Sequence, residues 1–211
     1  MKREHEIEKN ETQPLLIISG EDGIYDSSPY NHVIINTNVT TQDSSMYFNG
    51  SAMLNTDIGD LKITDGIFTL EMWLKLENTT KQYKCIADFC NHSTMYFDAS
   101  DNRDGTLIII NGAASWLASG SMMRNGTVIL TTNWQHVAIV GYGGQNRLFI
   151  NGIMQTGGYF DTCTNNMNMD NGKIRFGNIN YSNLSRYFKG CMKHIKLYNI
   201  AKYTSNFTPQ L

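Results

Sequence analysis

The residues best suited to chemistry stand close together in the segment NWQHVAIVGYGGQNRLFINGI, from Asn133 to Ile153. Trp134, His136 and Arg147 are residue types that bind ligands or transfer protons, so an active site is the first hypothesis. The pattern favours another interpretation, because the residues after Trp134 place apolar neighbours on both faces, as in a central strand of a sandwich. We therefore expect Trp134 in the core and His136 beside it as a hydrogen-bonded structural histidine.

The glycines of this segment also indicate geometry rather than ligand binding. GYGGQN turns the chain, and RLFINGI returns antiparallel to the strand before it. Asn151-Gly152 is the dipeptide that supplies the two positive φ angles of a type I′ hairpin turn. The sequence therefore predicts a hairpin scaffold here.

The elements around this hairpin are strands. Turn residues recur at intervals of roughly 8 to 12 residues, which is typical of an antiparallel all-β sandwich or barrel. GIFTLEMWLKL, residues 66–76, alternates strictly and predicts a strand with one strongly apolar face. We also expect strands in KIRFGNIN and in YFKGCMKHIKLYN.

The last of these strands predicts an apolar face of Cys191, Ile195 and Leu197, opposed by a set that includes Phe188 and Met192. The closing AKYTSNFTP is expected to turn and lay Tyr203 and Phe207 onto the sheet.

Length and charge limit the domain organisation and the partners. With 211 residues and three prolines, the chain suits one domain over 14–211, preceded by a charged arm over 1–13. A net charge of −2, with no basic run beyond the first residues, argues against nucleic acid. No apolar run approaches the roughly 20 residues of a membrane span, and the start lacks the apolar core of a secretory signal.

The order of the segments resembles a known family. FTLEMWLKL, CIADF, NWQHVAIVGYGGQNRLFING, IRFGN and YFKGCMKHIKLYN follow one another as in the laminin-G-like members of the concanavalin A-like lectin/glucanase superfamily. The resemblance covers about 45–209, and W-x-H-V-A followed by L-F-I-N-G is its most specific part. It implies a jelly-roll sandwich of two antiparallel sheets, in which these residues are scaffold.

The superfamily contains glycan binders, protein-binding modules and glycoside hydrolases. Its retaining glucanases carry two catalytic carboxylates on one strand as E-x-D-x-x-E, and such a pair is what glycoside hydrolysis requires. Glu71 is a lone carboxylate on its strand, and the last glutamate is Glu77. We therefore expect a non-catalytic protein.

The resemblance also bears on the cysteines and on calcium. Cys191 resembles the cysteine of the family's G-C motif, and Cys163 lies at the distance of its disulfide partner. Calcium is the family's common cofactor, and the acidic loop DASDNRDG offers oxygen ligands. A solvated acidic turn is the favoured interpretation of this loop, and a calcium site is the alternative. The candidate calcium ligands are Asp98, Asp101, Asn102 and Asp104.

With the scaffold discounted, ligand binding is expected in the loops. Sugar recognition needs an aromatic face against the ring and polar side chains for the hydroxyls. The candidate glycan-binding residues are Trp116, Tyr142, Asn146, Tyr159 and Asn165.

The sequence thus predicts a lectin-like module that binds cell-surface glycans, presented in several copies because a single lectin site binds weakly. A fold usually met outside cells, the missing export signal and an asparagine-rich composition favour a surface or tail component of a phage or virus particle. Its arm would attach it to other particle proteins. The alternative is a structural decoration protein of such a particle that binds no glycan.

Overall fold

The computed structural model describes most of the chain, and within the strands between residues 90 and 129 it describes the backbone alone. The described ranges are 13–59, 66–78, 84–92, 103–110, 113–118, 121–142, 145–155, 172–178 and 186–210.

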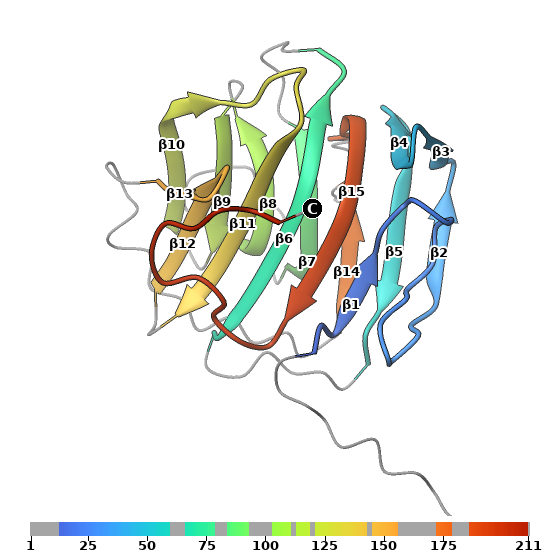
Figure 1. The fold of residues 1–211 in the computed structure, drawn as a ribbon, viewed down its shortest axis with the longest axis horizontal. Coiled ribbons are helices and arrows are strands. Elements are labelled where there is room, and N and C mark those ends of the chain that lie inside the picture. Colours follow the sequence, from blue (N-terminus) through green and yellow to red (C-terminus); the bar gives the residue numbers. More distant parts are fainter. Residues whose placement is uncertain are drawn as a thin grey trace, which may run out of the picture.

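These ranges form two antiparallel sheets that face each other (Figure 1). The first, sheet A, has the order β13 (Ile153–Met154), β12 (Gln145–Ile150), β11 (Gln135–Tyr142), β6 (Phe68–Leu76), β15 (Lys189–Tyr198), β4 (Ser45–Asn49), β3 (Thr40–Gln42), with β1 (Leu16–Ile18) also paired to β15. Sheet B has the order β10 (Ser121–Ile129), β9 (Ala113–Ala118), β8 (Arg103–Ile110), β7 (Lys84–His92), β14 (Lys173–Phe176), β5 (Met53–Asp57), β2 (Ile34–Thr37).

The predicted all-β jelly roll is confirmed. Helix is absent from the described part of the chain, where nothing helical is therefore long and apolar enough to cross a membrane.

The main core lies between the sheets, and β6 contributes to it as its alternation predicts. Phe68, Leu70 and Met72 are fully buried in this core, and Phe68 packs edge-on against Phe89 of β7 with ring centroids 5.8 Å apart. Burial of such large side chains is the main stabilising contribution to a sandwich.

β11 is apolar on both faces, as predicted for a central strand. Val137 and Ile139 belong to the main core. Ala138 and Val140 belong to a second, smaller cluster on the outer face of sheet A, the face turned away from sheet B. The predicted hairpin turn is also confirmed, since Asn151 has φ 50° and Gly152 has φ 75°.

The faces predicted for the last strand are wrong before Lys193 and right after it, since Phe188 and Met192 lie in the main core together with Ile195 and Leu197. His194 has φ 51°, and the register of β15 against β6 shifts between Lys193 and Lys196, which is a β-bulge. The bulge reverses the phase of the strand. Met192, placed on the polar side by strict alternation, therefore joins Ile195 in the main core.

Candidate functional site

The outer face of sheet A is divided into a covered part and an open part. Figure 1 shows the chain after β15 turning back across β12 and β11 toward β6. This C-terminal segment, residues 199–210, covers one half of the face. The other half, where β4, β15 and β6 reach the same end of the sheet, is covered by none of the described segments.

The covered half contains the most conspicuous charged cluster. Glu71 of β6 is 5% exposed, and its Oε1 accepts a hydrogen bond from Lys202 Nζ at 2.5 Å. Its Oε2 accepts one from Tyr203 Oη at 2.6 Å and lies 3.3 Å from His136 Nε2. Both carboxylate oxygens thus have partners. Two of the three partners, Lys202 and Tyr203, belong to the C-terminal segment, so these contacts hold that segment on the sheet.

These contacts change the protonation of the cluster. Burial would raise the pKa of the Glu71 carboxyl, but hydrogen bonds from His136, Lys202 and Tyr203 outweigh it and lower the pKa to about 2. Burial, together with the hydrogen bond to Glu71, raises the pKa of Tyr203 to about 12. The carboxylate therefore stays ionised wherever the protein is folded near neutral pH.

Aromatic rings complete the cluster and confirm that the closing residues lie on the sheet. Phe207 stacks on Tyr203 and meets the edge of the His136 ring at 5.6 Å, while Trp73 meets that ring from another side at 5.4 Å. The N–H of Phe207 donates to the carbonyl of Gly152 at 2.9 Å. We call Glu71, His136, Lys202, Tyr203 and Phe207 the clamp. His136 is the structural histidine that the sequence predicts.

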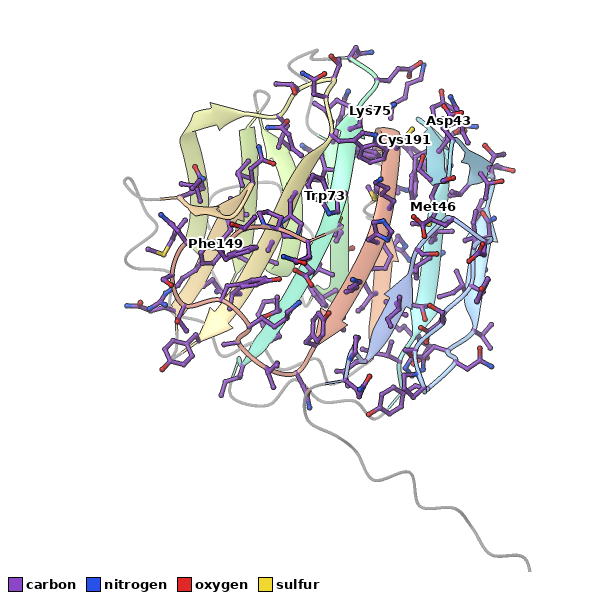
Figure 2. All side chains as sticks on the ribbon, in the orientation of Figure 1. Asp43, Met46, Trp73, Lys75, Phe149 and Cys191 are labelled. Carbon is purple, nitrogen blue, oxygen red and sulfur yellow. The ribbon has the colours of Figure 1, made fainter. Side chains whose placement is uncertain are left out.

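The open half of the face contains a hollow of about 360 Å³, a volume within the range of small-molecule sites. In the register of sheet A, Cys191 of β15 lies between Tyr47 of β4 and Lys75 of β6. Figure 2 labels Cys191 and Lys75 at this end of the sheet. The hollow is lined by Gln42, Tyr47, Lys75, Leu76, Glu77, Thr132, Gly190 and Cys191.

Gly190 is required at the wall of the hollow. A Cβ at this position would lie 2.2 Å from the carbonyl oxygen of Lys75, closer than real Cβ contacts permit. The missing side chain lets β15 and β6 pair closely beneath the hollow.

Trp134 stands beside the hollow and is half-buried, so its predicted place in the core is wrong. The ladder between β11 and β6 begins at Gln135, and Trp134 precedes it. Two ammonium groups lie over its ring instead, Lys75 Nζ at 5.3 Å and Lys193 Nζ at 5.0 Å from the ring centroid. Cation–π contacts of this kind keep an aromatic ring ordered near the surface.

Around the hollow, some charged side chains are in ion pairs and others are not. Glu77 forms an ion pair with Lys189 at 2.9 Å, and this hydrogen bond raises the pKa of Lys189. Lys75 and Lys193 have no carboxylate within 4 Å among the residues that the structure describes. The part of the hollow beside Trp134 is therefore positively charged.

Tyr142 and Asn146 were both predicted to contact glycan, and the structure exposes only Tyr142. Tyr142 ends β11 with 46% of its surface exposed, and the Arg147 guanidinium lies 5.4 Å from its ring centroid. Asn146 in β12 is 2% exposed, so it belongs to the scaffold of the hairpin.

The other predicted residues fall in parts of the chain that are described incompletely or not at all. Trp116 lies inside β9, opposite Leu107 of β8, rather than in a loop, and Asp104 belongs to β8. The calcium site and the remaining glycan contacts stay predictions, and no metal-binding group of acidic, histidine or cysteine side chains occurs among the described residues. Outside the described residues lie Asp98, Asp101, Asn102, Tyr159, Cys163 and Asn165.

Only one of the two cysteines of the predicted disulfide lies in a described part of the chain. Cys191 is buried and forms no disulfide with a described residue. Its expected partner Cys163 lies outside the described residues, so the bridge stays a prediction.

The hollow was not anticipated from the sequence. Its lining comes from separate segments, and Tyr47, Thr132 and Cys191 are brought together only by strand pairing. Locally, the outward positions of β6 change from the aromatic Trp73 to the charged Lys75, and this change alone does not mark a binding site.

Comparison with known proteins gives one match to a family model and several similar structures. The model described as the concanavalin A-like lectin/glucanases superfamily matches residues 53–205. No curated protein sequence matches this chain significantly.

Among solved structures, domain 4 of an extracellular arabinanase from Geobacillus stearothermophilus, in complex with arabinotriose, is similar with a TM-score of 0.62 and 16% identity, over 90% of this chain and 93% of that one. The botulinum neurotoxin serotype D binding domain has a TM-score of 0.64 and 15% identity, over 90% of this chain and 49% of that one. A botulinum neurotoxin type C structure, whose cell entry depends on two ganglioside molecules, has a TM-score of 0.65 and 11% identity, with the same coverage.

The chain thus spans about half the length of the neurotoxin domains, and at these identities the likeness concerns the fold. The family match covers more than half of the chain and agrees with the two antiparallel sheets. The chain belongs to the concanavalin A-like lectin/glucanases superfamily.

Proposed function

We propose that this protein is a non-catalytic, lectin-like module whose glycan ligand occupies the hollow beside Trp134. The observation that carries the proposal is the combination, at one open end of sheet A, of the Tyr47 ring and hydrogen-bonding side chains around a volume of about 360 Å³, with the Trp134 ring next to Lys75 of the lining. Sites of this kind bind sugars through ring faces and hydroxyl contacts.

The arrangement suits a chain of sugars better than a single ring. Tyr47, Lys75 and Trp134 follow one another across β4, β15, β6 and the start of β11, so the two aromatic residues stand three strand spacings apart, roughly 14 Å. Gln42 and Thr132 are exposed polar side chains of the lining, available to sugar hydroxyls.

Two of the similar structures support a glycan ligand. The arabinanase domain was solved with arabinotriose, and the type C neurotoxin interacts with gangliosides. The superfamily also includes glucanases. Against catalysis stands the state of the two carboxylates on and after β6: Glu71 is buried in the clamp, and Glu77 is paired with Lys189. A hydrolase needs carboxyl groups that face the scissile bond.

We further propose that the module belongs to the surface or tail of a phage or virus particle, where several copies would raise avidity. The support is the asparagine-rich sequence that begins with a charged arm. Particles purified by density gradient and probed with an antibody against the chain test this: the protein should band with the particles, and its presence in host cytosol alone would contradict the proposal.

The glycan proposal is tested on a broad glycan array with a tetravalent form of the protein, once with calcium and once with EDTA. We expect binding in both runs, reduced at least tenfold by Trp134→Ala or Tyr47→Ala and unchanged by Tyr142→Ala. Binding that depends on Tyr142 alone would move the site to the β11–β12 hairpin. Loss of binding in EDTA alone would favour the acidic loop near residue 100, and silence throughout would favour the structural alternative.

A further inference from the structure

Resting on the proposed function, we infer that the hollow selects glycans that carry an acidic group, a carboxylate or a sulfate, and that Lys75 and Lys193 bind this group.

The two lysines are held around one ring. Lys75 extends from β6 and Lys193 from β15, on neighbouring strands of the same outer face. Each ammonium lies about 5 Å from the centroid of Trp134. A lysine on a surface strand normally moves freely, whereas these two charges are oriented toward one place before any ligand arrives. Such preorganisation lowers the entropic cost of binding an anion.

Two other lysines near this face do have carboxylate partners. Lys202 binds Glu71, and Lys189 binds Glu77. Among the described residues, Lys75 and Lys193 have no carboxylate partner, and each lies over an aromatic ring, which is a weak partner for a cation at an exposed site. An anionic group between them would gain charge-assisted hydrogen bonds without displacing a carboxylate of the protein.

The positions of the positive and negative side chains also predict how the ligand is oriented in the hollow. Lys193 pairs with Trp73 in the register, four residues along β6 from Glu77, so the Cα atoms of Trp73 and Glu77 lie roughly 13 Å apart along the strand. Asp43, in the turn after Gln42, adds a second carboxylate on the side of Tyr47 (Figure 2). The acidic sugar is therefore placed at Trp134, and neutral sugars extend toward Tyr47 and Gln42.

The experiment compares neutral oligosaccharides with their sialylated, uronic acid and sulfated counterparts on one array. The variants are Lys75→Gln, Lys193→Gln and the double variant, and Lys173→Gln removes a positive charge from β14 of the other sheet as the control. Urea unfolding midpoints equal to that of the unsubstituted protein establish that the variants fold.

We expect the unsubstituted protein to bind the acidic member of a pair about tenfold more tightly. Each single variant should lose about threefold of this preference and the double variant all of it, with the preference measured as the ratio of acidic to neutral binding within each variant. Lys173→Gln should keep the preference. Raising the salt from about 0.1 M to about 1 M should reduce it, because screening shortens from about 10 Å to about 3 Å.

Equal binding of neutral and acidic partners by the unsubstituted protein would overturn this inference and leave the proposed function intact. A preference that the double variant keeps would overturn the roles of the two lysines. No binding to any glycan would contradict the proposed function, and the inference with it.

Discussion

The clamp and the hollow are two halves of one sheet face, supplied by the same strands. β6 contributes Glu71 to the clamp and Lys75 to the hollow, and β15 borders both. In the clamp, the C-terminal segment covers the polar residues, and Glu71 is paired with Lys202, Tyr203 and His136. In the hollow, no described segment covers them, and two lysines are left without a carboxylate partner.

The difference shows how one strand serves two purposes. A charged side chain covered by another segment must be paired, because an unpaired buried charge costs several kcal/mol. A charged side chain at the open end can stay unpaired in water, and its interaction energy remains available to a ligand. The position of residues 199–210 therefore decides which residues of the face stabilise the fold and which can bind.

The largest expected effect is a loss of stability caused by a substitution in the clamp. Glu71→Ala removes the acceptor of Lys202 and Tyr203, and we expect it to lower the free energy of unfolding by about 3 kcal/mol, the low end for a broken buried pair because Lys202 is partly exposed. Urea denaturation measures this. Glu77→Ala is the matched control, since it removes the carboxylate of an exposed ion pair and should lose far less. Equal losses would contradict the distinction between the two halves.

The pH dependence of stability sharpens the same contrast. The pKa of Glu71 is about 2 in the folded protein against 4.5 ordinarily, so its stabilisation is present above pH 4.5 and is lost as the pH falls toward 2. We expect this loss to reach about 3 kcal/mol. Glu71→Gln should flatten the dependence in this window, as followed by thermal unfolding at a series of pH values. An unchanged acid profile in the variant would show that other groups are responsible.

Local pattern was enough to predict the strands and the turn beneath the clamp, but neither the contacts of Glu71 nor the hollow. The alternation of β6, the apolar faces of β11 and the positive φ angles of Asn151-Gly152 are properties of short segments, so the sequence shows them directly. The bulge at His194 and the half-buried position of Trp134 depend on where strand pairing begins and shifts. Registers between distant segments leave no local periodicity, which is why the hollow could not be found before the fold.

A smaller effect is expected where the clamp meets the hairpin. Gly152→Ala would place a Cβ 1.9 Å from the carbonyl oxygen of Phe207, at a φ of +75°. We expect a loss of about 2 kcal/mol, from strain and from displacement of the C-terminal segment. Gly59→Ala is the matched control, because its φ is +64° and nothing lies within 4 Å of the added Cβ. We expect Gly59→Ala to lower the free energy of unfolding by about 1 kcal/mol, which measures the backbone strain alone. An equal loss for Gly152→Ala would show that the C-terminal segment moves aside without a cost in stability.

The smallest effect belongs to the open half, where contacts within the protein are weak. A double-mutant cycle of Trp134→Ala and Lys75→Ala should give a coupling of about 0.5 kcal/mol, the size of an exposed cation–π contact. Urea denaturation of the four proteins measures it, with Tyr142 and Arg147 as a second exposed pair for comparison. A coupling above about 2 kcal/mol would mean that Lys75 is committed to the ring and is not available to an anion. A small coupling together with a large effect on glycan binding would show that the open half keeps its interaction energy for the ligand, as the clamp does for the fold.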